Sequence, residues 1–156
     1  MAAYYLDASA VVKEYVFEPG SPVVGEILDT EALHDIHMSD IGGVEVAAGL
    51  ARRGRGRNSL SEPFQAAIRE FQHDFDTRWL IVGTTTDLLH EARTLAIRHF
   101  LRGYDAVHLA AALEADRLAT VAGERGLTSV SADTALNAAA EAEGLRVLDP
   151  TRTRPG

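Results

Sequence analysis

Four acidic side chains stand where an α/β fold would bring them together: Asp7, Glu45, Asp105 and Asp133. Two of them follow short apolar stretches that are typical of strands, and two lie in the first turns of expected helices. Each acid alone is explained by helix capping or by a solvated helix face. Together at one rim of a sheet, however, the four carboxylates would repel one another. A hard divalent cation, Mg²⁺ or Mn²⁺, removes that conflict because it prefers oxygen ligands, and the hydroxyls of Ser9 and Ser131 stand beside two of the acids.

The elements that must position these acids are short apolar stretches that alternate with amphipathic helices. Strands are expected at residues 4–6, 37–39, 79–82, 127–131 and 145–148. Helices are expected at residues 9–17, 21–29, 40–53, 60–75, 88–99, 104–117 and 134–143. This order predicts a single three-layer α/β/α domain over residues 1–150, with a central, mostly parallel sheet, and a short C-terminal tail over residues 151–156. Parallel sheets place ligands at the carboxyl ends of their strands, where the four acids are expected to meet.

Finer expectations concern how these elements pack. One face of the helix over residues 40–53 is assigned to Val44, Ala47, Ala48 and Ala51. Residues 79–82 are expected to form a buried strand, and Gly103 is expected to end the helix before it. The helical spacing of Phe64, Phe71 and Phe75 indicates core packing rather than a platform for stacking bases.

Charge and composition exclude several functions. The chain has 156 residues, with 15 Lys and Arg against 23 Asp and Glu and a formal net charge of −8. Binding of nucleic acid through generic positive charge is therefore disfavoured, unless a metal inverts the local charge. Cysteine is absent and Lys13 is the only lysine, which excludes thiol chemistry and a phosphate-loop nucleotide site. The first residues do not read as a signal peptide and no run reaches about 18 apolar residues, so a cytoplasmic protein without membrane association is expected.

The stretches around the acids resemble, in order, the four acidic blocks of PIN domains, and most closely those of the VapC toxins of toxin–antitoxin pairs. They read LDASAVVK at 6–13, SD at 39–40 with VEV at 44–46, YDAVHLA at 104–110, and VSAD at 130–133. The resemblance covers nearly the whole chain and implies a PIN-like fold. It also implies that Asp7, Glu45, Asp105 and Asp133 are catalytic, metal-binding acids with Ser9 and Ser131 in support. The connection over residues 113–132 departs from the family pattern, which leaves Asp116 as a substitute for Asp133.

The function implied by this resemblance is that of an endoribonuclease dependent on Mg²⁺, with Mn²⁺ as the other candidate. One or two such ions would lower the pKa of a bound water, orient the resulting hydroxide for in-line attack on a phosphodiester and stabilise the leaving oxygen. Similar proteins cut single-stranded regions of transfer or ribosomal RNA, and the implied products carry a 5′-phosphate and a 3′-hydroxyl. A toxin also implies a cognate antitoxin that blocks the acidic groove. A homodimer is expected, with the helices over residues 22–29 and 47–53 as its candidate surfaces.

Two further features bear on the same activity. Arg52, Arg53 and Arg55 lie in the only dense basic patch, which would either track an RNA backbone away from the acids or form a solvated helix end. His108 follows Asp105 by one helical turn. A supporting role for His108 is preferred to a ligand role, because Mg²⁺ favours oxygen donors.

Two other functions remain open from the sequence. One is a catalytically silent PIN-like scaffold that binds protein or RNA, although such a scaffold has no physical need for four crowded acids. The other is a phosphatase with Asp7 as its nucleophile. That chemistry commonly needs a second carboxylate near the first, and position 9 is a serine.

Overall fold

The computed structural model describes residues 1–152, which fold around one five-stranded sheet. The strands are β1 (Ala3–Leu6), β2 (Asp35–Ser39), β3 (Leu80–Val82), β4 (Leu127–Val130) and β5 (Arg146–Leu148). The helices are α1 (Ala8–Tyr15), α2 (Ser21–Leu28), α3 (Asp40–Arg53), α4 (Glu62–Thr77), α5 (Thr86–His99), α6 (Gly103–Val121) and α7 (Thr134–Ala142), with a 3-10 turn η1 (Thr30–Ala32). Every neighbouring pair of strands is parallel, in the order β3-β2-β1-β4-β5. The expected α/β architecture is thus confirmed.

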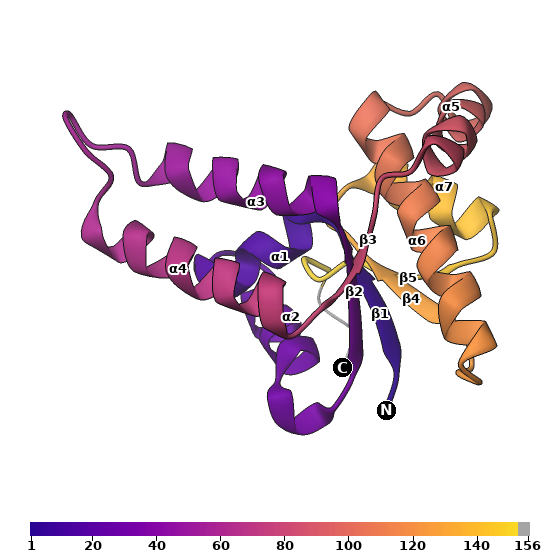
Figure 1. The fold of residues 1–156 in the computed structure, drawn as a ribbon, viewed down its shortest axis with the longest axis horizontal. Helices are drawn as coiled ribbons and strands as arrows, with labels where there is room; N and C mark the ends of the chain where they lie inside the picture. The colour runs from indigo at the N-terminus through magenta and orange to yellow at the C-terminus, as the bar shows by residue number, and fades with distance from the viewer. Residues whose placement is uncertain (153–156) are drawn as a thin grey trace.

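Alternation along the central strand β1 creates two apolar cores, one on each face of the sheet. Ala3 and Tyr5 pack in a cluster with α5, α6 and α7, whereas Tyr4 and Leu6 belong to a cluster with α1 to α4. Successive side chains of a strand point to opposite faces, so four residues serve both layers. Figure 1 shows the two groups of helices on either side of the sheet.

Three strands pass into helices through a capping side chain at the same edge of the sheet. Asp7 caps α1, Ser39 caps α3 and Asp133 caps α7. In each case the side-chain oxygen accepts the backbone N–H three residues further on, which would otherwise lack a partner in the first helical turn. This capping places the first turns of three helices at the carboxyl edge of the sheet.

The buried face of α3 differs from the expected one. Val44 is 71% exposed, and the residues that enter the core are Val46 and Leu50. The helix approaches α4 so closely that a Cβ on Gly43 would lie 2.6 Å from the ring of Phe75. Close contact through this glycine turns Val44 outward, which the spacing of alanines alone did not indicate.

Two further expectations are corrected at β3 and α6. β3 pairs only with β2 at the edge of the sheet, and Leu80 is 49% exposed while Trp79 and Val82 are buried, so the expected strand is only partly buried. α5 ends at His99, and its cap Phe100 adopts a left-handed backbone conformation with φ of 55°. Gly103 does not end that helix; it is the first residue of α6.

Helices α3 and α4 form a hairpin whose tip points away from the sheet (Figure 1). A bridge between Arg55 and Leu60 closes the tip. Phe71 is buried, and Phe64 and Phe75 pack against the same cluster, which confirms the core role expected for the aromatic stripe.

No helix within residues 1–152 is long and apolar enough to cross a membrane. The expected tail over residues 151–156 lies outside the described residues from position 153 onward.

Candidate active site

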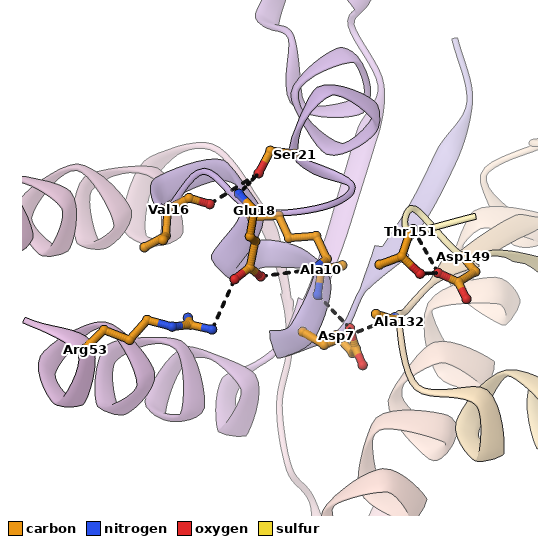
Figure 2. A network of polar contacts seen from close by, with 11 residues as sticks. Asp7, Ala10, Val16, Glu18, Ser21, Arg53, Ala132, Asp149 and Thr151 are labelled. Carbon is orange, nitrogen blue, oxygen red and sulfur yellow. Dashed lines mark hydrogen bonds and ion pairs between the residues drawn. The ribbon is translucent and has the colours of Figure 1, made fainter. Parts of the chain in front are cut away.

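Asp7 is a buried carboxylate held by three donors. Its side chain is at the end of β1, with a residue exposure of 5%. Oδ1 accepts the Ala10 N–H at 3.0 Å and the Ser9 hydroxyl at 2.7 Å, and Oδ2 accepts the Ser131 hydroxyl at 2.6 Å. Figure 2 shows Asp7 at the start of α1, between Ala10 and Ala132. These contacts fix the carboxylate in one orientation.

The two serines connect the ends of β1 and β4. The Ser9 hydroxyl accepts the N–H of Ala132 at 3.0 Å, and the Ser131 hydroxyl accepts the N–H of Asp133 at 3.0 Å. The amide of Asn137 donates to the carbonyl of Ser131 at 2.8 Å. The expected supporting place of both serines beside Asp7 is therefore observed. The sequence did not predict this contact of Asn137, although the residue lies four positions after Asp133 and therefore near it on the surface of α7.

Glu45 is linked to the core by His108. The Nε2 atom of His108 lies 2.5 Å from Oε2 of Glu45, and Nδ1 lies 2.7 Å from the hydroxyl of Tyr5. A carboxylate only accepts, so Nε2–H donates to Glu45, and in the neutral ring the Tyr5 hydroxyl donates to Nδ1. His108 and Tyr5 are both buried, whereas Glu45 reaches the surface. His108 thus supports one of the acids, as the sequence indicated, and Tyr5 is an addition to the site.

The electrostatics of the acids are dominated by burial and mutual repulsion. Burial raises the pKa of Asp7 above its ordinary value, although the positive charge of His108 and the three hydrogen bonds oppose this. Burial and the neighbouring charge of Asp133 raise the pKa of Asp105. Burial alone would lower the pKa of His108, but Glu45, Asp7 and Asp105 outweigh it and raise that pKa. Acids from four different elements therefore share one electrostatic environment.

A pocket opens at this edge of the sheet. Its volume is about 930 Å³, and Glu45, Asp105 and Asp133 are all part of its lining. Asp7 is not part of the lining but is hydrogen-bonded to Ser131, in the segment that carries Asp133. The structure thus brings three of the four sequence-derived acids to one pocket and links the fourth to it.

The acids at this edge of the sheet are candidate ligands for a metal ion. Within residues 1–152, no group of three or more His, Cys, Asp or Glu side chains is arranged closely enough to hold a metal ion. None of Asp7, Asp105 and Asp133 forms an ion pair with a basic side chain in the same part of the chain. The charges of Asp133 and Asp7 both raise the pKa of Asp105, and such neighbouring carboxylates without basic partners suit a hard divalent cation, whose shell is usually completed by water. The donor chemistry fits, and a cation would draw the side chains together.

Two other sequence candidates lie elsewhere. Asp116 accepts the N–H of Leu127 at 2.8 Å, at the amino end of β4 and therefore at the opposite edge of the sheet, so it does not replace Asp133. Arg53 forms an ion pair with Glu18 at 3.2 Å (Figure 2). Glu18 also pairs with Lys13 at 2.9 Å. Arg52 and Arg55 are exposed at the far end of the α3–α4 hairpin.

Comparison with known proteins identifies relatives over the whole fold. A family model described as PIN domain matches residues 4–142. Two proteins of Mycobacterium tuberculosis, Ribonuclease VapC45 and Ribonuclease VapC49, are each 34% identical over 154 residues, which cover 96% of this chain and 100% of each relative. The solved structure of FitAB bound to a DNA fragment has a TM-score of 0.63 at 17% identity and covers 97% of both chains. Mycobacterium tuberculosis VapC20, described as a sarcin-ricin loop cleaving toxin, has a TM-score of 0.60 at 16% identity and covers 92% of this chain and 96% of its own.

Proposed function

The chain belongs to the PIN-domain family, and on that basis we propose that it is an endoribonuclease of the VapC type, the toxin of a toxin–antitoxin pair. The observation that carries this proposal is that Glu45, Asp105 and Asp133 line one open pocket, with Asp7 held by Ser131 in the segment that leads to Asp133. The relatives that share 34% of the sequence are named ribonucleases. The substrate is RNA, with transfer or ribosomal RNA as the candidate targets.

The proposed chemistry is hydrolysis of a phosphodiester bond. A divalent ion, Mg²⁺ or Mn²⁺, supplies Lewis acidity that activates water and offsets charge on the phosphate. Asp105, Asp133 and Glu45 present their oxygens to the pocket, and Asp7 adds a carboxylate whose orientation Ser9 and Ser131 hold. His108 orients Glu45 through its Nε2–H. The products carry a 5′-phosphate and a 3′-hydroxyl.

An antitoxin is the proposed protein partner. The solved structures with the same fold include a toxin–antitoxin complex from Klebsiella pneumoniae, with a TM-score of 0.60 at 18% identity. A homodimer through the exposed sides of α2 and α3 is part of the same proposal. Arg52 and Arg55 are proposed to contact RNA beyond the pocket, whereas Arg53 already pairs with Glu18.

The function is tested by incubating the purified protein with a mixed pool of transfer and ribosomal RNA in Mg²⁺ or Mn²⁺. Discrete cleavage products are expected, and they should be lost in EDTA and in the Asp105→Asn variant, which removes one pocket carboxylate. Asp76→Asn is the matched control, because Asp76 is an exposed acid on α4 outside the site. Normal cleavage by folded Asp105→Asn protein would disprove the assignment of the site.

The geometry also argues against the phosphatase alternative. A phosphatase with Asp7 as its nucleophile commonly needs a second carboxylate beside it. The side chains hydrogen-bonded to the Asp7 carboxylate are instead the hydroxyls of Ser9 and Ser131. These contacts favour a positioned ligand over a nucleophile with its own general acid.

A further inference from the structure

The pocket beside the acids has an apolar wall that metal chemistry does not require. Helices α5 and α6 supply this wall, with Leu89, Ala92, Ala96, Tyr104 and Val107, and Ile41 of α3 faces it. Tyr104 is 63% exposed and Leu89 is 43% exposed. An aromatic ring and an aliphatic side chain thus stay accessible directly beside Asp105, although burial would be favourable for both.

Two guanidinium groups line the same pocket. Arg93 of α5 and Arg102, which precedes α6, are both exposed and both part of the lining. Within residues 1–152 neither pairs with a carboxylate; the contact of Arg93 is a ring nitrogen of His90, 3.1 Å away. In a chain with a net charge of −8, two cations without carboxylate partners beside the catalytic acids provide local complementarity to phosphate.

From this juxtaposition we propose that the pocket between α5 and α6 is a subsite for one unstacked nucleotide next to the scissile phosphate. The base packs on the ring of Tyr104 and on Leu89, and the flanking backbone phosphate lies near Arg102 and Arg93. The inference rests on the proposed ribonuclease function. The volume of about 930 Å³ falls in the range of pockets that enclose small organic ligands, which gives room for a nucleotide.

An RNA occupant is favoured over a peptide because acidic, aromatic and basic groups line the same pocket. The lining combines three acids, the exposed ring of Tyr104 with apolar neighbours, and the guanidinium groups of Arg93 and Arg102. These groups are complementary to the reacting phosphate, the base and a flanking phosphate of a single strand. Single-stranded RNA is typically bound by stacking of splayed bases on aromatic side chains and by basic contacts to its backbone. The subsite therefore selects RNA whose base at this position is free of pairing, such as a loop nucleotide.

The proposal is tested by binding of a short labelled single-stranded RNA, cut by the wild type at a mapped position, to protein made inactive by Asp105→Asn. Adding Tyr104→Ala is expected to weaken binding roughly 5- to 150-fold, the range for loss of one stacked base, while Tyr104→Phe binds as before. Adding Arg102→Ala is expected to flatten the dependence of log affinity on log salt by about 0.7, the value for one phosphate contact with a single strand. Phe100→Ala and Arg69→Ala are the matched controls, since both residues are exposed and neither lines the pocket.

A double-mutant cycle separates base stacking from damage to the fold. An abasic nucleotide beside the cleavage position should weaken binding to the protein with Tyr104 and have little further effect on Tyr104→Ala. If the two losses simply multiply, or if Tyr104→Ala binds and cuts RNA normally, the subsite is disproved and a protein partner becomes the better occupant. The proposed function fails separately, because it is disproved if the folded wild type produces no metal-dependent cleavage of RNA, whatever the effect of Tyr104→Ala on binding.

Discussion

His108 shows how a single buried side chain can control an exposed acid. Its ring bridges the Tyr5 hydroxyl in the core and the carboxylate of Glu45 at the pocket. A free glutamate near the surface would sample several rotamers, and a fixed donor restricts them. The negative charges of Asp7 and Asp105 also favour a proton on His108, which strengthens the bond to Glu45. His108 is thus a positioning residue for Glu45.

His108→Phe tests this role. The variant keeps an aromatic ring of similar size but removes the donor to Glu45, so we expect a 10- to 100-fold loss of activity or of apparent Mg²⁺ affinity. The measurement is cleavage rate as a function of Mg²⁺ concentration, with folding checked by circular dichroism.

Tyr5→Phe is the control, because it removes the contacts of the Tyr5 hydroxyl with His108 Nδ1 and with Ser39 but keeps the Nε2–H donor to Glu45. It should lower the free energy of unfolding by about 1 kcal/mol with a much smaller effect on the Mg²⁺ requirement. An unchanged Mg²⁺ requirement in His108→Phe would show that Glu45 needs no such support.

Among the elements, the sequence was most informative where local chemistry decides the structure. The caps at Asp7, Ser39 and Asp133 and the apolar spacing of α4 have local causes, and the order of strands and helices could be predicted from them. The outward turn of Val44 could not, because it depends on contact between Gly43 and Phe75 of another helix. The edge position of β3 likewise depends on strand order, which apolar content does not reveal.

The residues of the candidate site also divide into those that the sequence could predict and those that only the tertiary structure reveals. The four acids and two serines lie next to strand ends, so the parallel topology alone brings them together. The link from Tyr5 through His108 to Glu45 spans 103 and 63 positions in sequence, and no local pattern shows such a distant partner.

Asp40 also lies at this edge, but Thr84 donates to its carboxylate from the backbone N–H at 2.9 Å and from its hydroxyl. That contact ties α3 to the loop after β3.

Helix packing on the other face includes a buried polar contact that can be tested. Asp74 of α4 accepts the Tyr15 hydroxyl of α1 at 2.7 Å and pairs with Arg78 at 2.9 Å. Tyr15→Phe should lower the free energy of unfolding by about 1.5–3 kcal/mol, the usual contribution of a hydrogen bond to a charged group. Urea denaturation measures this, with Tyr4→Phe as the matched control. RNA cleavage at low temperature should be unchanged, since the contact lies away from the pocket; a large loss of activity in folded Tyr15→Phe would contradict that separation.

For the whole molecule, the acidic edge makes stability depend on metal and on pH. The pKa of Asp7 is higher in the folded protein than in the unfolded chain because burial disfavours its charge. A raised folded-state pKa means that the folded protein holds the proton more tightly. Stability from this group is therefore present at low pH and is lost as the pH rises through the folded-state pKa. Above the folded-state pKa the metal-free protein carries a destabilising buried charge, which a divalent cation would offset.

Asp7→Asn isolates this effect. In EDTA at pH 8 the variant should melt at a higher temperature than the wild type, because it removes a buried charge while Ser9 and Ser131 can still hydrogen-bond to the amide. The difference should shrink as the pH is lowered through the folded-state pKa of Asp7 toward the ordinary pKa of an aspartate. Adding Mg²⁺ should raise the melting temperature of the wild type more than that of the variant, since an ion that binds only the folded state stabilises it by mass action. Asp76→Asn, an exposed acid, serves as the control and should follow the wild type throughout. A variant less stable than the wild type at pH 8 without metal would mean that the hydrogen bonds to the Asp7 carboxylate outweigh its burial.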